Sequence, residues 1–373
     1  MPQYIPEPDY QHGNARKIGV LLVNLGTPDA PDAPSLRRYL KQFLSDPRVV
    51  EIPRVIWWLI LNLIILNTRP AKSAAKYATV WRTDGGGSPL RYWTEQQAHG
   101  LAERLGNDGG EPVAVAWGMR YGNPSIESAV LSLRAQGCDR ILLMPMYPQY
   151  AASTTASSFD ALAATFRRLR NVPGLRTVRN YHDHPAFIAA LAARVRGFWA
   201  EHGQPDKLVM SFHGVPRYTR DKGDPYHCEC HKTGRLLAEA LGLNKDQYLV
   251  SFQSLFGRAE WIKPYTEPTL RELAKAGVKN VQVMCPGFPA DCLETIEEIG
   301  MEVRDAFLED GGEQYNFIPC LNDDPVWLDA LAQMTREQLA GWRNPHWNAD
   351  ALTARQQEQV VQQAAAKAFG AAQ

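Results

Sequence analysis

The sequence has no long hydrophobic run, few cysteines and no excess of charge of either sign. Its longest nearly continuous apolar run covers residues 55–66, whereas a helix that spans a bilayer needs about 20 residues. Six cysteines in 373 residues are too sparse for the disulfide framework of a small secreted protein and suit a reducing compartment. The 40 basic and 40 acidic residues cancel, so no net positive field favours nucleic acid. We therefore expect a soluble cytoplasmic protein that does not bind nucleic acid.

The N-terminal stretch agrees with this expectation. The first 17 residues are polar and rich in proline, and they lack the apolar centre of a signal peptide. The length of the chain predicts about two domains, which is enough to bury a substantial core.

The apolar run 55–66 has two interpretations. It fits a helix buried in the core, because it is too short to span a membrane. However, prolines and basic residues flank it, and Trp57 and Trp58 lie near Arg54, a combination found where a surface element enters the headgroup region. We favour an exposed apolar lip over residues 53–70 that makes transient peripheral contact with the inner membrane.

Two segments of the chain repeat one order of strand, turn, helix, glycine, strand and turn. They are residues 113–155 and 249–295, and Pro124 and Pro264 occupy equivalent places 140 positions apart. Alternating strands and helices with short turns predict parallel sheets with right-handed crossovers. The duplication therefore predicts an α/β fold of two similar Rossmann-like lobes with a cleft between them.

The repeat also sets the expected division of the chain. We expect an N-terminal lobe over residues 16–178 and a C-terminal lobe with the catalytic residues over 179–325. A helical segment over 326–373 is expected to pack back on the first lobe.

His213 ends the apolar run 207–213, which predicts a buried parallel strand. Ligands of open α/β sheets bind beyond the carboxyl ends of the strands, where a histidine can coordinate a metal or transfer protons near neutral pH. The alternative is a strand-end histidine that only hydrogen-bonds a neighbouring loop. The equivalent residue in the first copy is Leu25, so one half of the chain carries the charged chemistry.

Glu294 follows a later strand of the same half, so we expect it to face the same crevice as His213. An imidazole and a carboxylate form an incomplete shell for a divalent iron-group metal and can also accept protons. Asp291 and Glu294 fit a helix-capping pattern as well, but this does not explain Glu298 and Glu302. Their four-residue spacing aligns three carboxylates on one helical face, which fits either a solvated face or a path for protons or cations.

Aromatic residues at neighbouring strand ends suit a large, flat hydrophobic ligand, although each alone fits a core position. They are Tyr147, Phe256, Trp261 and Phe288.

Eight motifs between about residues 16 and 335 form a specific combination. They are LVNLGTP (22–28), GGGSPL (85–90), MRYGNP (119–124), YPQYAASTT (147–155), SFHGVP (211–216), GDPY (223–226), the stretch 253–261 and DCLET (291–295). On these motifs the chain resembles the ferrochelatase family, and within it the Gram-negative bacterial branch. Its members are lyases that insert Fe²⁺ into protoporphyrin IX to make protohaem, the terminal step of haem biosynthesis.

The resemblance implies the chelatase-like version of the fold, in which each lobe is a parallel four-stranded sheet flanked by helices. It implies iron binding and pyrrole deprotonation by His213 and Glu294, a hydrophobic lip at 55–66, and an acidic line at Glu298 and Glu302. The positions that match the porphyrin pocket of the family are Leu25, Tyr77, Ser88, Arg120, Tyr121, Trp261, Phe288 and Asp291.

The chain departs from parts of the family. Cys292 stands where many members have a histidine, which puts the auxiliary role of that residue in doubt. Animal members hold a [2Fe–2S] cluster with cysteines of a C-terminal extension, but residues 336–373 contain no cysteine and Ala152 occupies the remaining ligand position. We therefore expect no cluster and no required cofactor, with Fe²⁺ as a substrate. The run 227–231, His-Cys-Glu-Cys-His, fits either a polar loop before a helix or a metal site of its own.

Two other functions remain open from the sequence. One is a related chelatase that acts on another tetrapyrrole such as sirohydrochlorin, although the many carboxylates of that substrate would call for more Arg and Lys than an apolar lip offers. The other is a non-enzymatic carrier of haem or iron, which an assay of turnover would distinguish.

Overall fold

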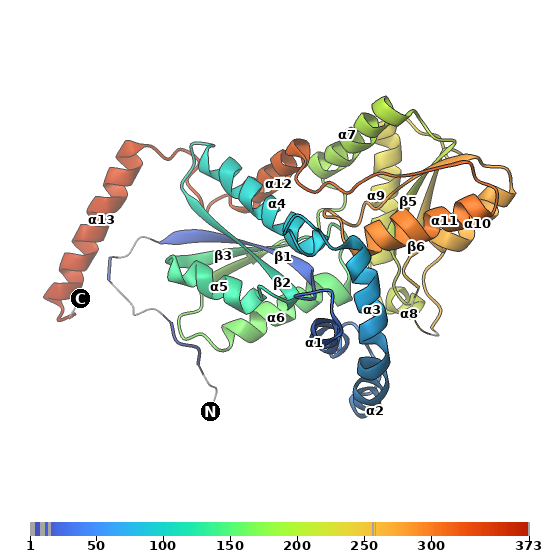
Figure 1. Ribbon diagram of the computed structural model, residues 1–373. Coiled ribbons are helices and arrows are strands. Elements are labelled where there is room, and N and C mark those ends of the chain that lie inside the picture. Colours follow the sequence, from blue (N-terminus) through green and yellow to red (C-terminus); the bar gives the residue numbers. More distant parts are fainter. Residues whose placement is uncertain (1–3, 8–11, 14–15, 256, 258, 372–373) are drawn as a thin grey trace.

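The computed structural model describes residues 4–7, 12–13, 16–255, 257 and 259–371 (Figure 1). Within these residues the strands form two separate parallel sheets. The first sheet has the order β2-β1-β3-β4 and the second has the order β6-β5-β7-β8. The first sheet consists of β1 (Lys17–Thr27), β2 (Val113–Gly122), β3 (Cys138–Pro145) and β4 (Gly174–Thr177). The second consists of β5 (Lys207–His213), β6 (Tyr248–Gln253), β7 (Asn280–Met284) and β8 (Gln314–Phe317).

The two sheets are equivalent strand by strand, which confirms the duplication predicted from the sequence. In each sheet the first strand of the lobe lies between the second and the third. The predicted α/β class, with two four-stranded parallel sheets flanked by helices, is confirmed. The central strands are apolar along their length because helices cover both of their faces, and Val20 to Val23 of β1 are fully buried.

The helices of the first sheet follow its strands in the expected alternation. Asp32 caps α1 by accepting a hydrogen bond from the backbone N–H of Ser35, and Ser125 caps α5 in the same way through Ser128. The helices are α1 (Ala33–Leu44), α2 (Arg54–Leu59), α3 (Leu66–Val80), α4 (Pro89–Gly106), α5 (Ile126–Ala135) and α6 (Ser157–Phe166), with π-helical segments at Ile60–Ile65 and Ala152–Ala156.

The second half continues the same pattern and ends in helices beyond the sheet. Its elements are α7 (Pro185–His202), α8 (Arg217–Asp221), α9 (Tyr226–Leu241), α10 (Thr266–Lys275), a π-helical segment Glu294–Glu302, α11 (Val303–Glu309), α12 (Pro325–Gln338) and α13 (Ala349–Ala368). Helix α12 packs against both α4 and α7, whereas α13 stands away from the two sheets at the edge of the molecule (Figure 1).

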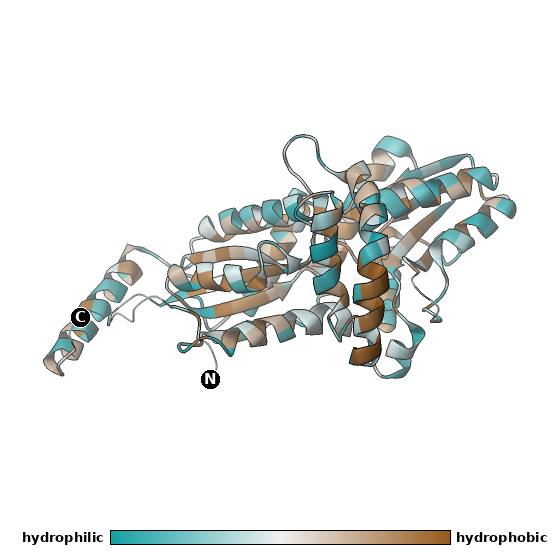
Figure 2. Ribbon diagram, turned by 60° about the horizontal axis from the view of Figure 1, so that its bottom comes forward, coloured by the Kyte–Doolittle hydropathy of each residue, from teal (hydrophilic) through white to brown (hydrophobic). Residues whose placement is uncertain are grey.

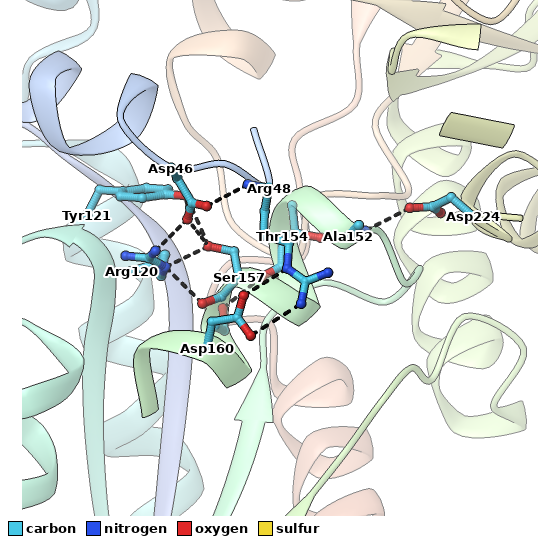
Figure 3. A network of polar contacts seen from close by, with 10 residues as sticks. Asp46, Arg48, Arg120, Tyr121, Ala152, Thr154, Ser157, Asp160 and Asp224 are labelled. Atoms are coloured by element: carbon cyan, nitrogen blue, oxygen red, sulfur yellow. Dashed lines mark hydrogen bonds and ion pairs between the residues drawn. The ribbon is translucent and has the colours of Figure 1, made fainter. Parts of the chain in front are cut away.

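The two halves share a core and a polar interface. One continuous hydrophobic cluster includes Leu22 and Met144 from the first sheet and Met210 and Phe212 from the second. On the polar side, the loop after β3 donates its backbone N–H groups to carboxylates of the second half. Tyr150 donates to Glu229 at 2.7 Å. Ala152 donates to Asp224 at 2.8 Å (Figure 3). These contacts hold the carboxyl ends of both sheets beside one another.

The apolar run 55–66 lies on the surface, so its interpretation as a core helix is wrong. Val55, Trp58 and Leu63 are 77%, 61% and 64% exposed, and the run forms the strongly hydrophobic helical turns in Figure 2. Trp57 and Leu61 on the opposite side are buried against α1 and its following loop. The described part of the chain contains no helix with the length and apolar character needed to cross a bilayer.

Candidate active site

His213 is the last residue of β5, at the carboxyl end of the second sheet. Its Nδ1 lies 2.6 Å from the carbonyl oxygen of Gly214. A carbonyl can only accept a hydrogen bond, so Nδ1 carries the proton and the lone pair of the neutral imidazole is on Nε2. The contact with a neighbouring loop that the alternative interpretation of His213 predicted is therefore present. It occupies only Nδ1, however, and leaves Nε2 oriented as a metal ligand or a base.

Glu294 begins the π-helical segment that follows β7. Gln253, the neighbour of His213 in the sheet, donates from Nε2 to the backbone carbonyl of Glu294 at 2.9 Å. The thiol of Cys292 hydrogen-bonds the Glu294 side chain, and burial together with the Glu294 charge raises the pKa of Cys292 well above its ordinary value. Cys292 is thus a neutral hydrogen-bond donor beside the carboxylate.

Glu298 lies one turn further along and faces the same site. Its carboxylate accepts the backbone N–H of Ser254 at 2.6 Å and also the Ser254 hydroxyl. Burial raises the pKa of Glu298, opposed by the Ser254 hydrogen bonds and the charge of His213. Ser254 has a positive φ of 65°, a conformation that few non-glycine residues adopt and that often marks functional sites.

Glu302 forms an ion pair with a residue from the other half of the chain. Lys76 of α3, in the first half of the chain, contacts Glu302 at 2.7 Å and Glu297 at 2.9 Å. Burial alone would lower the pKa of Lys76, but these two carboxylates raise it. The acidic helix is therefore compensated by a lysine from the opposite lobe rather than by a base on its own element.

Aromatic rings from the second lobe surround His213. The ring of Trp261 lies 6.3 Å and that of Phe288 lies 6.5 Å from the imidazole, centroid to centroid. Trp261 is buried, and its Nε1 has no hydrogen-bond partner among the described residues. Phe256, a further aromatic candidate, lies outside the described residues.

The first lobe contributes a second wall. Leu25 packs with Tyr39, Tyr77 and Tyr121, and this cluster reaches Leu293 beside the catalytic candidates. Tyr77 hydrogen-bonds Thr27 and Tyr39, and burial followed by the charge of Glu294 raises its pKa well above the ordinary value. Its hydroxyl therefore stays protonated and faces the carboxylate from across the two lobes.

Ser88 lies at the start of α4, and its hydroxyl accepts a 2.7 Å hydrogen bond from Thr27. A cavity of about 560 Å³ adjoins Ser88 and is lined by Trp81, Arg91, Tyr92 and the glycines of residues 85–87. Neither His213 nor Glu294 lines this cavity.

Arg120 and Tyr121 belong to a polar network around Asp46 (Figure 3). The Asp46 carboxylate accepts from the Tyr121 hydroxyl at 2.8 Å, from Ser157 at 2.6 Å, and from the Arg120 guanidinium. Burial would raise the pKa of Asp46, but these donors together with the backbone N–H of Arg48 lower it. Arg120 is consequently held in place by a buried carboxylate rather than free in solvent.

Asp291 does not cap the helix as the capping pattern predicts. Its carboxylate accepts instead from the Thr295 hydroxyl at 2.9 Å, from Asn322 Nδ2 at 2.7 Å and from the backbone N–H of Cys320. Because these donors fix the chain on both sides of Cys292, Asp291 positions the segment that carries Glu294.

The structure thus brings His213, Glu294 and Glu298 together, with the rings of Trp261 and Phe288 near the imidazole and the cluster of Leu25 and Tyr77 reaching Leu293. Leu25 and Phe288 also pack against one apolar cluster around Cys292. Sequence reasoning missed four residues of this region, Asp46, Lys76, Gln253 and Ser254. Gln253 and Ser254 could have been found, because they lie at the carboxyl end of β6, the strand equivalent to β2. Asp46 and Lys76 could not, since their partners are far away in the sequence.

Two parallel-sheet lobes with an imidazole and carboxylates at their shared edge define a protein of the chelatase class. The structure of SirB from Bacillus subtilis with Fe³⁺ matches this fold with a TM-score of 0.53, covering 87% of this chain and 97% of that chain. The two sequences are 13% identical, so the likeness concerns the fold alone.

The sequence comparisons identify the family within this class. The family model described as ferrochelatase matches residues 17–339. Ferrochelatases of Chromobacterium violaceum and Azoarcus sp. are 60% and 57% identical to this chain, and each alignment covers 92% of this chain and 93% of the relative. The chain belongs to the ferrochelatase family, the lyases that insert Fe²⁺ into protoporphyrin IX to give haem.

Proposed function

We propose that this chain inserts Fe²⁺ into protoporphyrin IX, with release of two protons, at the site formed by His213 and Glu294. The observation that carries the proposal is the meeting of one oriented imidazole and two carboxylates from the second lobe with an apolar wall from the first. The reaction requires a weak metal shell, a proton acceptor and a flat hydrophobic surface, and the residues at this site are the candidates for all three.

His213 Nε2 and the Glu294 carboxylate form the transient shell for Fe²⁺. Imidazole and carboxylate are both suitable ligands for this ion. A shell of two protein ligands remains incomplete, so the ion can pass to the four pyrrole nitrogens of the substrate. The protonated Cys292 thiol hydrogen-bonds the carboxylate and orients it without competing for the metal. The Tyr77 hydroxyl, also protonated, adds no charge beside it.

The two pyrrole protons are accepted by residues of the same site, His213 and Glu298. His213 Nε2 accepts one after the ion has passed from it to the porphyrin, because Nδ1 already carries a proton that it donates to the carbonyl of Gly214 and only the Nε2 lone pair is then free. Glu298, whose pKa is raised, accepts a proton more readily than an exposed glutamate and passes it along the acidic line. Glu302 at the outer end of that line admits cations or releases protons.

The porphyrin is gripped between the two walls. Trp261, Phe288 and Leu25 contact its faces, and Arg120 and Ser88 meet its polar edge, with Tyr121 and Asp291 holding the surrounding backbone and side chains. Binding of a flat macrocycle between packed walls can bend it toward the transition state, so that its nitrogen lone pairs tilt out of plane.

No cofactor is required by this scheme, and we propose that the chain holds no [2Fe–2S] cluster. Of its six cysteines, five are buried and Cys228 is exposed. Among the described residues, no group of three or more His, Cys, Asp or Glu is arranged to hold a metal ion. Analysis of purified protein for iron and acid-labile sulfide tests this proposal, which predicts neither in stoichiometric amount.

The exposed lip supports a cytoplasmic enzyme that touches the membrane peripherally. The lip leads along the chain directly into α3, the helix that carries Tyr77. A hydrophobic porphyrin could thus be taken up from, and haem released to, a lipid surface.

An assay with purified protein distinguishes this function from its rivals. Protoporphyrin IX and coproporphyrin III are each supplied with Fe²⁺ under anaerobic conditions, and metalloporphyrin is quantified per site. A ferrochelatase makes many equivalents of haem, whereas a haem or iron carrier stops at one. A protein that metallates sirohydrochlorin but neither porphyrin would overturn the proposal.

A further inference from the structure

The run 227–231 is not a loop but the first turns of α9, and it places two imidazoles side by side. His227 and His231 are four positions apart on the helix and therefore share one face. Their ring centroids are 4.5 Å apart, with an angle of 60° between the rings. His227 is half-buried and His231 is exposed.

A single aromatic ring fixes the orientation of this pair. Phe252, buried in β6, stacks on His227 at 5.6 Å with an angle of 21° and meets His231 edge-on at 5.8 Å. Among the described residues, ring contacts are the interactions found for the two side chains, and no hydrogen bond to a ring nitrogen of either is found. The ring nitrogens are thus left for a ligand.

We propose that His227 and His231 form a second metal site, which binds a divalent transition ion such as Zn²⁺ or Cu²⁺ with water as the remaining ligands. Two nitrogens that each lie about 2.0–2.1 Å from one zinc ion must be within about 4 Å of each other, which the separation of the rings allows. Imidazole is a preferred ligand for these ions, and affinity rises from Fe²⁺ toward Cu²⁺ and Zn²⁺. The site therefore favours ions other than the iron substrate.

The charge state of the pair suits metal binding. Burial lowers the pKa of both histidines, and for His227 the neighbouring His231 and then Arg220 lower it further. Neutral imidazole is the form that binds a metal, so protons compete weakly near neutral pH.

The site is separate from the catalytic one. Phe252 and Gln253 are consecutive in β6, so their side chains lie on opposite faces of the sheet. Gln253 contacts Glu294 on the catalytic face, whereas Phe252 carries the two histidines on the α9 face. An ion on α9 would also brace the turn that carries Glu229, which holds the backbone of Tyr150 in the first lobe.

Calorimetric titration of the porphyrin-free, EDTA-stripped protein with Zn²⁺ tests the proposal. The titration is made in the His213→Ala background, which removes the imidazole of the catalytic site. We expect His227→Gln and His231→Gln each to remove one Zn²⁺ equivalent and to abolish the rise in melting temperature that Zn²⁺ causes. His202→Gln is the matched control, because His202 is an exposed helical histidine whose partner one turn earlier is Phe198.

A second variant keeps the number of imidazoles constant. In His231→Gln/Lys232→His the second ring moves by one position, which turns it about 100° around the helix and out of reach of His227. Loss of the Zn²⁺ equivalent in this variant, with an unchanged melting temperature in EDTA, supports a paired site. Zn²⁺ stoichiometry equal to that of the parent in all three α9 variants would overturn the proposal.

Discussion

At the scale of single residues, the two copies of the fold differ in chemistry at one position, the carboxyl end of an equivalent strand. Leu25 and His213 occupy equivalent places, and only the imidazole can bind a metal or accept a proton. The Gly214 carbonyl fixes its tautomer, so His213 acts through Nε2.

Replacement of this residue gives the first prediction. His213→Ala should reduce kcat for haem formation by about 10²-fold or more, the usual contribution of a positioned acid–base group. Binding of protoporphyrin, measured by quenching of tryptophan fluorescence, should change little, because the walls remain. His202→Ala serves as the control. Retention of full turnover by His213→Ala would remove His213 from the mechanism.

Glu298 provides a prediction on pH and stability. Its pKa in the folded protein is raised from 4.5, so the folded state binds the proton more tightly than the unfolded state. The resulting contribution to stability is complete below about pH 4.5 and is lost as the pH rises through the folded pKa. Glu298→Gln keeps an acceptor for the Ser254 N–H but cannot ionise. In urea unfolding from pH 4.5 to 8, the free energy of unfolding of the parent should fall relative to that of the variant. Parallel pH curves for the two proteins would contradict this.

At the scale of elements, the sequence was sufficient to predict the strands but not the π-helical segments that contact the site. Apolar runs and the internal repeat predicted both sheets, since burial on both faces requires continuous apolar residues. The π-helical segments Ala152–Ala156 and Glu294–Glu302 carry no such periodic signal. Their positions after β3 and β7 are equivalent, so the duplication extends to them, but only the structure reveals their hydrogen bonding.

The contact between α3 and the acidic helix leads to a prediction about iron. Lys76 neutralises Glu297 and Glu302 at the outer end of the proposed path. A partly exposed charge a few ångström from a passing cation is worth on the order of 1 kcal/mol, or about fivefold in affinity. Lys76→Met should therefore lower the KM for Fe²⁺ by about that factor, with kcat nearly unchanged. Lys72→Met, one turn earlier on the same helix, is the control. An unchanged KM in initial-rate measurements would place the iron path elsewhere.

The lip can be tested without disturbing the core. Trp58→Asp and Leu63→Asp change side chains that are more than half exposed, so the melting temperature should stay close to that of the parent. Each apolar side chain that enters a lipid surface contributes about 1.5–3 kcal/mol when fully buried, so co-sedimentation with anionic phospholipid vesicles should fall by about tenfold or more. Val172→Asp, an exposed apolar position outside the lip, should leave vesicle binding unchanged. Equal vesicle binding by all three variants would exclude the lip as the contact.

At the scale of the whole molecule, the two lobes are joined by the chain that follows the second sheet. Arg343 is buried and donates to the backbone carbonyls of Leu105 and Glu111 and to both oxygens of Asp108, all in the first lobe. We expected residues 326–373 to pack back on the first lobe, but Arg343 itself could not be singled out, because its partners are more than 200 positions away. Beyond it, α13 has no buried residue.

Two truncations therefore should behave differently. A chain that ends at residue 348 lacks α13 but keeps Arg343, and its free energy of unfolding and turnover should be close to those of the full chain. Arg343→Ala, or a chain that ends at residue 341, removes these hydrogen bonds, while Arg336 still pairs with Asp108. Loss of a hydrogen bond to a charged group costs about 1.5–3 kcal/mol, so a loss of at least this size is expected. Urea unfolding monitored by tryptophan fluorescence measures both. If the chain ending at residue 348 lost as much free energy of unfolding as the chain ending at residue 341, then α13 rather than Arg343 would attach the C-terminal segment to the first lobe.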